Sequence, residues 1–334
     1  MSRQTATSSP GLVQEFFTDY MVQQRALSPR TVASYRDTFV LLLRFAEARL
    51  GLAAHELAIV DLNAKLLSEF LDHLEVQRHN SVRSRNVRLA AIRAFLKFAA
   101  RREPASLGAI QSALAVPMKR YDRKLVGFLT REQMTGVINV ATDTWIGQRD
   151  RLMLTILFNT GARVSEIIGV RVGDVVLGPC SSIKLRGKGR KQRSLPLWKS
   201  AAKGVREWLY LNPQLVEDSP LLPTRDGRHM TRANVAQRLQ LAVEAASVRY
   251  PELRSMKVSP HVVRHTTAMS LLQAGTDACE IALWLGHESP STTHMYVEAD
   301  LAMKQRTLAR LKQPEARPAV YRPPKALLAF LQSL

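Results

Sequence analysis

Six side chains of the types that break and remake phosphodiester bonds lie between positions 163 and 296 of this sequence. The candidate nucleophile is Tyr296, which follows His287 by nine residues. Before them, the run His261-Val262-Val263-Arg264 places an imidazole three residues ahead of a guanidinium. Another guanidinium and an ammonium come earlier in the chain. The full set of candidate catalytic residues is Arg163, Lys188, His261, Arg264, His287 and Tyr296.

These side chains suit an attack on a phosphodiester, where phosphate charge must be neutralised and the leaving oxygen protonated. Arg163 and Arg264 suit the first task, because a planar guanidinium binds two phosphate oxygens at once. Lys188 stands in a Gly-Lys-Gly turn and suits the second task, as a general acid for the leaving 5′-oxygen. Tyr296 would attack phosphorus and form a phosphotyrosyl bond.

The two histidines would move protons and contact the phosphate. His261 lies one helical turn before Arg264, on the same helix face, and can exchange protons near neutral pH. His287 follows Gly286, a helix stop, so its ring could donate a hydrogen bond to a phosphate oxygen. No carboxylate cluster suited to Mg²⁺ stands among the six residues. The sequence therefore predicts a site without a metal.

Each of these residues also has an ordinary structural explanation when taken alone. A single tyrosine usually packs in a core, and His261 could be a structural histidine. Arg163 could simply pair with Glu166, one helical turn later, and Glu166 itself is expected to be structural. The basic stretch 184–193 could be a solvated loop. The order and local context of the whole set favour chemistry over coincidence.

Composition indicates a nucleic-acid partner. The chain has 334 residues, 46% of them hydrophobic, and a formal net charge of +20. A length of this kind allows two domains with real cores, and such a charge attracts polyanions. Cys180 and Cys279 are the only cysteines and form no zinc motif. Neither a signal peptide nor a membrane span is predicted. We expect a soluble, cytoplasmic, nucleoid-associated protein.

Residues 11–103 are predicted to form a helical, DNA-binding domain. Ser28-Pro29 begins one helix, 63–76 supplies another, and 81–102 carries an apolar stripe of Val87, Ala91, Phe95 and Phe98. Basic residues without any acidic neighbour flank that stripe, which predicts one packed face and one face for phosphates. The candidate DNA-binding residues here are Arg83, Arg85, Arg88, Arg93 and Lys97.

A linker is expected over 104–127, a catalytic domain over 128–315, and a tail over 316–334. Within the catalytic domain, 182–197 is predicted to be a β-hairpin with a basic tip, where Arg190 and Lys191 are further candidates for DNA binding. Helices surround this hairpin. The tail is proline-rich and basic and then turns apolar from Ala326, which predicts a short helix.

The motifs resemble the boxes of the tyrosine recombinases, the phage integrase family, and most of all its Xer-like bacterial branch. They are Thr160–Glu166, Gly187–Gly189, Ser259–His265, Leu285–His287 and Thr292–Tyr296, and all six catalytic positions match. The resemblance implies a mainly α fold with a small β-hairpin or sheet, in which a SAM-like helical core-binding domain precedes the tyrosine-recombinase catalytic domain.

The resemblance also implies what the protein acts on. Its partner would be double-stranded DNA carrying specific recombination sites. A tetramer would hold two such sites and exchange strands through a 3′-phosphotyrosyl intermediate and a Holliday junction, with no cofactor. One departure is the thirty-eight residues after Tyr296, more than an Xer-like end requires. In this family a C-terminal helix often docks on a neighbouring protomer, although packing on its own domain and disorder remain alternatives.

Two other functions share some of these features. A type IB topoisomerase-like enzyme, which relaxes DNA, uses the same tyrosine, arginine, lysine and histidine chemistry, but the separate basic N-terminal domain argues against it. A catalytically silent DNA-binding regulator could keep the fold, but the complete catalytic set argues against that. Relaxation of supercoils by a monomer, without paired sites, would favour the topoisomerase.

Overall fold

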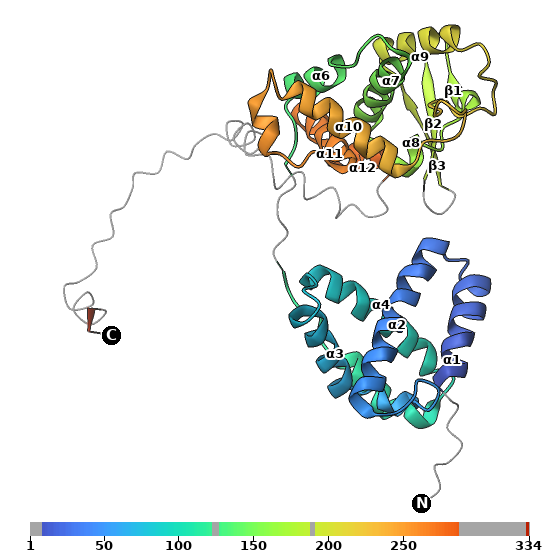
Figure 1. The fold of residues 1–334 in the computed structure, drawn as a ribbon, viewed down its shortest axis with the longest axis vertical. Coiled ribbons are helices and arrows are strands. Elements are labelled where there is room, and N and C mark those ends of the chain that lie inside the picture. Colours follow the sequence, from blue (N-terminus) through green and yellow to red (C-terminus); the bar gives the residue numbers. More distant parts are fainter. Residues whose placement is uncertain (1–8, 122–126, 188–190, 287–331, 334) are drawn as a thin grey trace, which may run out of the picture. The chain divides into compact units, whose positions relative to one another are not determined.

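The protein is described by a computed structural model that covers residues 9–121, 127–187, 191–286 and 332–333. The chain divides into two compact units, residues 1–124 and 125–334 (Figure 1). The predicted fold class is confirmed: both units are mainly helical, and a small sheet lies in the second.

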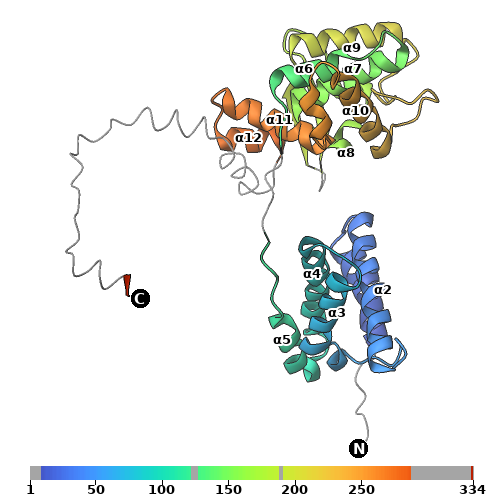
Figure 2. The same cartoon turned by 60° about the vertical axis from the view of Figure 1, so that its left-hand side comes forward.

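The N-terminal unit is a set of helices packed around one apolar core (Figure 2). Phe16, Phe39, Phe70 and Phe95 are among its fully or almost fully buried side chains. Its elements are α1 (Ser9–Glu15), the π-helix η1 (Phe16–Gln24), α2 (Pro29–Leu50), the 3₁₀ turn η2 (Ile59–Asp61), α3 (Ala64–Val76), α4 (Val82–Ala99), the 3₁₀ turn η3 (Pro104–Ser106) and α5 (Leu107–Ala115).

The helix starts of this unit follow their expected caps. Ser28, Asn63 and Ser81 each accept a hydrogen bond from the backbone N–H three residues later, and Pro29 occupies the first turn of α2. Gly51 ends α2 in the left-handed conformation, with φ of 69°. Local sequence therefore fixes these boundaries, and burial of one face of each helix fixes the packing.

Two expectations for this unit are wrong. The segment 104–127 is not simply a linker, because α5 buries Ile110 and Ala113 in the N-terminal core. Val87 is not part of the buried stripe of α4, since 53% of it is exposed, whereas Leu89 and Ile92 are buried. The other three residues of the predicted stripe, Ala91, Phe95 and Phe98, are buried as expected, and Arg85 near the start of α4 is also buried.

The second unit surrounds a three-stranded antiparallel sheet with helices. The elements are α6 (Arg131–Asn139), α7 (Trp145–Thr160), α8 (Val164–Ile167), the 3₁₀ turn η4 (Val172–Asp174), β1 (Val175–Val176), β2 (Ser182–Arg186), β3 (Gln192–Pro196), α9 (Lys199–Leu211), α10 (Arg232–Ala246), the 3₁₀ turn η6 (Pro251–Ser255), α11 (Pro260–Gln273) and α12 (Ala278–Leu285). The strand order is β1-β2-β3.

The predicted hairpin is confirmed as β2 and β3, with Leu185 paired to Arg193 and Ile183 to Leu195. The short strand β1 was not expected. Ile183, Leu185 and Leu195 point into the core with α7 and α11, while alternate residues are exposed. The hairpin therefore packs on the core through alternate residues of β2 and β3.

The helix boundaries around the candidate site are also set by local capping residues. Thr130 and Gln133 form a reciprocal capping box at α6, and Ser259 caps α11 ahead of Pro260. Asp277 caps α12 by accepting from the Cys279 N–H, although Glu280 does not complete a capping box there. Gly161 and Gly286 end α7 and α12 in the left-handed conformation.

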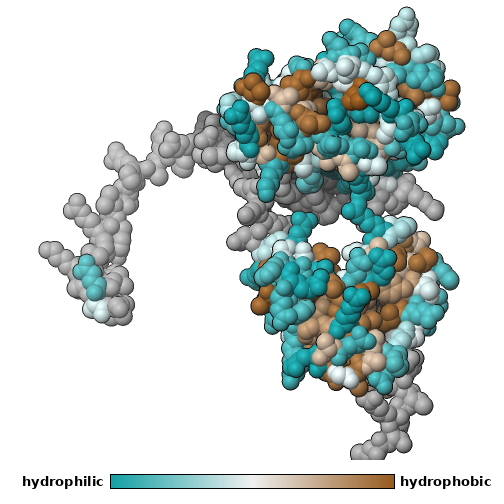
Figure 3. Space-filling model, in the orientation of Figure 1, coloured by the Kyte–Doolittle hydropathy of each residue, from teal (hydrophilic) through white to brown (hydrophobic). Residues whose placement is uncertain are grey.

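Both units carry scattered apolar side chains at the surface. Figure 3 shows hydrophobic residues interspersed with hydrophilic ones on the face that it presents. Within the part of the chain that is described, no helix is long and apolar enough to cross a bilayer.

Candidate active site

The structure describes three of the six candidate catalytic residues: Arg163, His261 and Arg264. Lys188, His287 and Tyr296 lie outside the described residues, as do Arg190 and the predicted tail helix apart from its end. The described part of the site therefore consists of the guanidiniums, His261 and the segment that leads up to His287.

Arg163 is brought to the site by the turn between α7 and α8. Gly161 adopts φ of 60°, which turns the chain sharply at the end of α7. A Cβ on this glycine would lie 2.5 Å from Leu285 Cδ2, so the close approach of α12 also requires glycine. Arg163 then caps α8, and its side chain is 39% exposed, which leaves part of the guanidinium open to a ligand.

Arg264 reaches the same place from α11. It is buried, with 4% of the residue exposed, and donates from Nη1 to the Gly161 carbonyl and from Nη2 to the Leu285 carbonyl, both at 2.7 Å. Arg163 donates from Nη2 to the carbonyl of Gly286 at 3.1 Å. The two predicted clamp residues therefore meet at the C-terminal end of α12. Each guanidinium carries five N–H donors, which makes a pair of arginines suited to binding an anion.

Glu166 is a buried carboxylate at this site, and a third arginine, Arg193, binds it. Its side chain is 1% exposed and accepts from Arg193 at both oxygens, each at 2.9 Å. It also accepts from Arg163 twice, through the backbone N–H at 2.8 Å and through Nη1 at 3.0 Å. The structural role expected for Glu166 agrees with these contacts.

The protonation state of Glu166 follows from the same contacts. Burial raises the pKa of Glu166, but the Arg193 hydrogen bonds, the Arg163 backbone N–H and the two nearby positive charges outweigh it. The pKa of the carboxyl group is lowered as a result, and Glu166 is ionised at neutral pH. Two guanidiniums, Arg163 and Arg193, bind this one carboxylate and leave a net positive charge, which favours a bound anion.

Arg193 was missed as a site residue, because in the sequence it is one of many basic residues between 184 and 193. The signal that identifies it is its register. It is paired with the inward-facing Leu185, so its side chain lies on the core face of the hairpin. A charged residue at such a position requires a partner of opposite charge.

The two histidines of the His261 box have different surroundings. His261 is exposed in the first turn of α11, one turn before Arg264. His265 is 3% exposed, and its ring meets Phe128 with centroids 6.1 Å apart. His261 is therefore accessible from solvent, whereas His265 packs within the unit beside Phe128.

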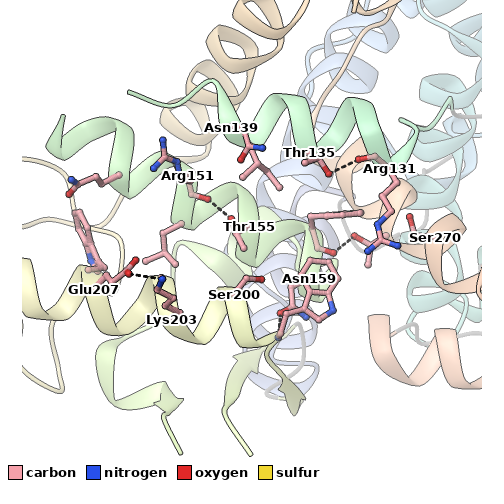
Figure 4. A pocket seen from close by; sticks show the side chains of 18 of the residues that line it. Arg131, Thr135, Asn139, Arg151, Thr155, Asn159, Ser200, Lys203, Glu207 and Ser270 are labelled. Carbon is pink, nitrogen blue, oxygen red and sulfur yellow. Dashed lines mark hydrogen bonds and ion pairs between the residues drawn. The ribbon is translucent and has the colours of Figure 1, made fainter. Parts of the chain in front are cut away.

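A large groove also lies on this unit. It has a volume of about 1310 Å³ and is lined from α6, α7, α9 and α11, with Arg131, Asn159 and Ser200 among its residues (Figure 4). None of Arg163, His261 and Arg264 lines it. Trp284 of α12, whose carbonyl accepts a hydrogen bond from Arg193, does line the groove.

In the N-terminal unit, one of the five basic candidates on α4 is buried. Arg85 is 4% exposed and forms an ion pair with Glu75 at 2.9 Å, and its Nη1 donates to the Pro117 carbonyl. The expectation that Arg85 is presented to phosphates is therefore wrong, because it holds the segment after α5 against α4. Arg93 is half-buried and donates to the Val116 carbonyl.

The remaining candidates form a more accessible set. Arg83 and Lys97 are exposed, and Arg88 is half-buried. Burial and the positive charge of Arg78 lower the pKa of Arg88, and Asp37 opposes that shift. Two guanidiniums thus lie close enough to repel, an arrangement that a bound phosphate would stabilise. On the hairpin, Lys191 is exposed next to the turn.

Comparison with known proteins supports the motifs. Residues 127–303 match the family model "Phage integrase family", and residues 14–103 match "Phage integrase, N-terminal SAM-like domain". The putative integrase/recombinase y4rC of Sinorhizobium fredii is 43% identical over 97% of both chains. Tyrosine recombinase XerC of Pelobacter propionicus is 31% identical over 89% of this chain and 95% of its own.

A similar fold occurs in a solved structure, the XerH site-specific recombinase bound to a palindromic difH substrate in a post-cleavage complex. The TM-score is 0.68 at 18% identity, with 93% of this chain and 91% of that chain covered. The likeness extends over both units and supports the two-domain organisation at the level of fold.

Proposed function

Because this chain belongs to the phage integrase family, we propose that it is a site-specific DNA recombinase that acts through a 3′-phosphotyrosyl intermediate. The observation that carries the proposal is the meeting of Arg163 and Arg264 at the end of α12, immediately before His287. Two guanidiniums at this point would bind a scissile phosphate. Gly286, at the end of α12, precedes the candidate nucleophile Tyr296 by ten residues in the sequence.

The proposed reaction exchanges one phosphodiester for another. The Tyr296 oxygen attacks phosphorus and loses its proton to a nearby base, for which the exposed His261 is the candidate. The bond from phosphorus to the 5′-oxygen breaks, and Lys188 gives that oxygen a proton. Arg163, Arg264 and His287 stabilise the charge on the phosphate oxygens. A free 5′-hydroxyl then reverses the steps on the phosphotyrosyl bond, which joins the strands.

Lys188 as general acid has a specific chemical test. Lys188→Ala should lose most cleavage of ordinary DNA, by on the order of 10²-fold. The same variant should recover on DNA whose 5′-bridging oxygen is replaced by sulfur, because a thiolate leaves without a proton. Single-turnover cleavage of both substrates measures the effect. Lys184→Ala is the control, because Lys184 is an exposed residue of strand β2. Failure of the sulfur substrate to restore cleavage would assign the proton to another group.

DNA binding by the N-terminal unit and the hairpin is proposed for Arg83, Arg88, Lys97, Arg190 and Lys191. Their charges would contact the backbone and release counterions. Each lost phosphate contact should lower the slope of log affinity against log salt by about 0.9. We therefore expect Arg83→Ala and Lys97→Ala to flatten the salt dependence of duplex binding. A change at Arg36, which is exposed but paired with Asp37, is the control. An unchanged slope for both test variants would remove them from the interface.

We propose that the active assembly is a tetramer on two DNA sites in the cytoplasm, associated with the nucleoid. The tail over 316–334 would dock on a neighbouring protomer through Leu327, Phe330, Leu331 and Leu334, which repeat at helical spacing.

The experiment that tests the function mixes two duplexes selected for binding, without ATP, and follows strand exchange together with the mass of the complex. Recombinant products and four protomers per pair of sites are expected. Relaxation of supercoiled DNA by a monomer, with no exchange, would favour the topoisomerase-like alternative. Binding with no cleavage would favour a regulator.

A further inference from the structure

Arg193 is tied to the site through every nitrogen of its guanidinium. Nη1 and Nη2 bind the two oxygens of Glu166, and Nε donates to the Trp284 carbonyl at 2.9 Å. Only 14% of the side chain is exposed. Unlike the exposed basic residues of the same hairpin, Arg193 therefore has little surface left for DNA. Its role must come from the groups that it binds within the protein.

The first thing that Arg193 holds is the partner of Arg163. Glu166 accepts from both arginines, so the orientation of this buried carboxylate sets the distance at which Arg163 stands. If Arg193 were absent, Arg163 would be the only guanidinium among the contacts that the structure gives Glu166. A buried carboxylate in that state draws its remaining partner strongly. Arg163 would then turn towards Glu166 and away from an incoming phosphate.

The second element that Arg193 holds is the C-terminal end of α12. The carbonyls of Trp284, Leu285 and Gly286 are three consecutive acceptors, and each receives a different arginine: Arg193, Arg264 and Arg163 respectively. The last carbonyls of a helix lack intrahelical donors and carry the negative end of its dipole, so cations stabilise them.

Gly286 is packed directly on the same guanidinium. A Cβ at position 286 would lie 2.9 Å from Nη1 of Arg193, so this glycine gives the guanidinium room beneath the chain. His287 is the next residue. Arg193 therefore packs against Gly286, the last residue before the candidate histidine.

From these contacts we propose that Arg193 is a positioning residue: it fixes Glu166 and the end of α12, and through them the Arg163 guanidinium and the entry to His287. The inference rests on the proposed function for its consequence in DNA cleavage. The anchoring of α12 is independent of that function and can be measured without DNA.

The test compares Arg193→Met with Arg186→Met. Methionine keeps much of the length and apolar stem of arginine and removes the charge. Arg186 is the matched control, because it lies on the same hairpin and also binds a buried carboxylate, Asp174, at 2.7 Å. Its hydrogen bond and ion pair in the described part of the chain go to Asp174 and not to α12. Three quantities are measured: backbone hydrogen exchange of 278–290, affinity for a half-site, and single-turnover cleavage.

We expect Arg193→Met to raise exchange at the end of α12, to leave half-site affinity unchanged, and to slow cleavage by about 10²-fold, the cost of a misplaced catalytic group. Arg186→Met should change neither exchange nor cleavage. If Arg193→Met does not fold, Arg193→Lys carries the test, since it retains the charge beside Glu166 but cannot span both oxygens and the Trp284 carbonyl.

Three results would overturn the proposal. One is normal cleavage by the folded variant, even with faster exchange, because the anchor would then not position the site. Another is unchanged exchange. The third is an equal loss of cleavage in the Arg186 control, which would indicate a general effect of charge on the hairpin. If instead the wild-type protein cleaves no DNA, the proposed function fails, and hydrogen exchange alone decides whether Arg193 anchors α12.

Discussion

Replacing Tyr296 with phenylalanine should abolish covalent attachment to DNA and leave DNA binding unchanged. The substitution removes one hydroxyl, so the charge and the shape of the protein that meet DNA stay the same. Without that oxygen no phosphotyrosyl bond can form, and the expected loss is complete rather than partial. A nicked suicide substrate, from which the cleaved strand diffuses away, converts each cleavage into a stable adduct visible on a denaturing gel.

The matched control for this change is Tyr321→Phe, because Tyr321 is the other tyrosine that follows the His287 box. It should form adduct at the wild-type rate. Adduct formation by Tyr296→Phe together with its loss in Tyr321→Phe would transfer the nucleophile to Tyr321. Adduct in both single variants would mean that neither hydroxyl is required.

The second large effect is expected when either clamp arginine becomes lysine. Lysine keeps the positive charge but loses the planar fork that binds two phosphate oxygens. Arg163→Lys and Arg264→Lys should each reduce cleavage by on the order of 10²-fold or more. Arg171→Lys is the control, since Arg171 forms an exposed ion pair with Asp218. Near-normal cleavage by both clamp variants would rule out a bidentate clamp.

The two clamp variants should differ in stability. Arg264 is buried and binds two carbonyls that a lysine cannot reach together, so Arg264→Lys should destabilise the unit by roughly 1–3 kcal/mol. Arg163 is partly exposed, and its replacement should cost less. Thermal unfolding of each variant separates this loss from the loss of cleavage, which is measured well below the transition.

Much of the fold could be predicted from the sequence because its signals are local. Ser28, Asn63, Thr130 and Ser259 act within one turn of the helix that each one caps. The hairpin likewise follows from alternation over a few residues. These features depend on residues that are neighbours in the chain. A short segment of sequence is therefore enough to predict them.

The errors in the N-terminal unit come from contacts between distant residues. The inward position of Arg85 near the start of α4 depends on its ion pair with Glu75 on α3. The helix at 107–115 looked like part of a linker because charged and proline-containing sequence follows it, although Ile110 and Ala113 are buried. Composition could not indicate which basic side chains turn inwards.

The candidate site divides in the same way. The motifs identified Arg163 and Arg264 as a pair, but not that both bind the end of α12. Arg193 could not be singled out among the basic residues of the hairpin without the register of β2 and β3 and the position of Glu166. These contacts join residues up to 123 positions apart, between Arg163 and Gly286. Charge counts carry no information about such distances.

The central claim is that Tyr296 joins the protein to the 3′ end of a cleaved DNA strand. Its most direct test is to trap wild-type protein on a suicide substrate, digest the protein and the DNA, and sequence the nucleotide-bearing peptide by mass spectrometry. We expect a single modified peptide, with a 3′-nucleotide on Tyr296. A nucleotide on any other residue, or a 5′-linked one, would contradict it.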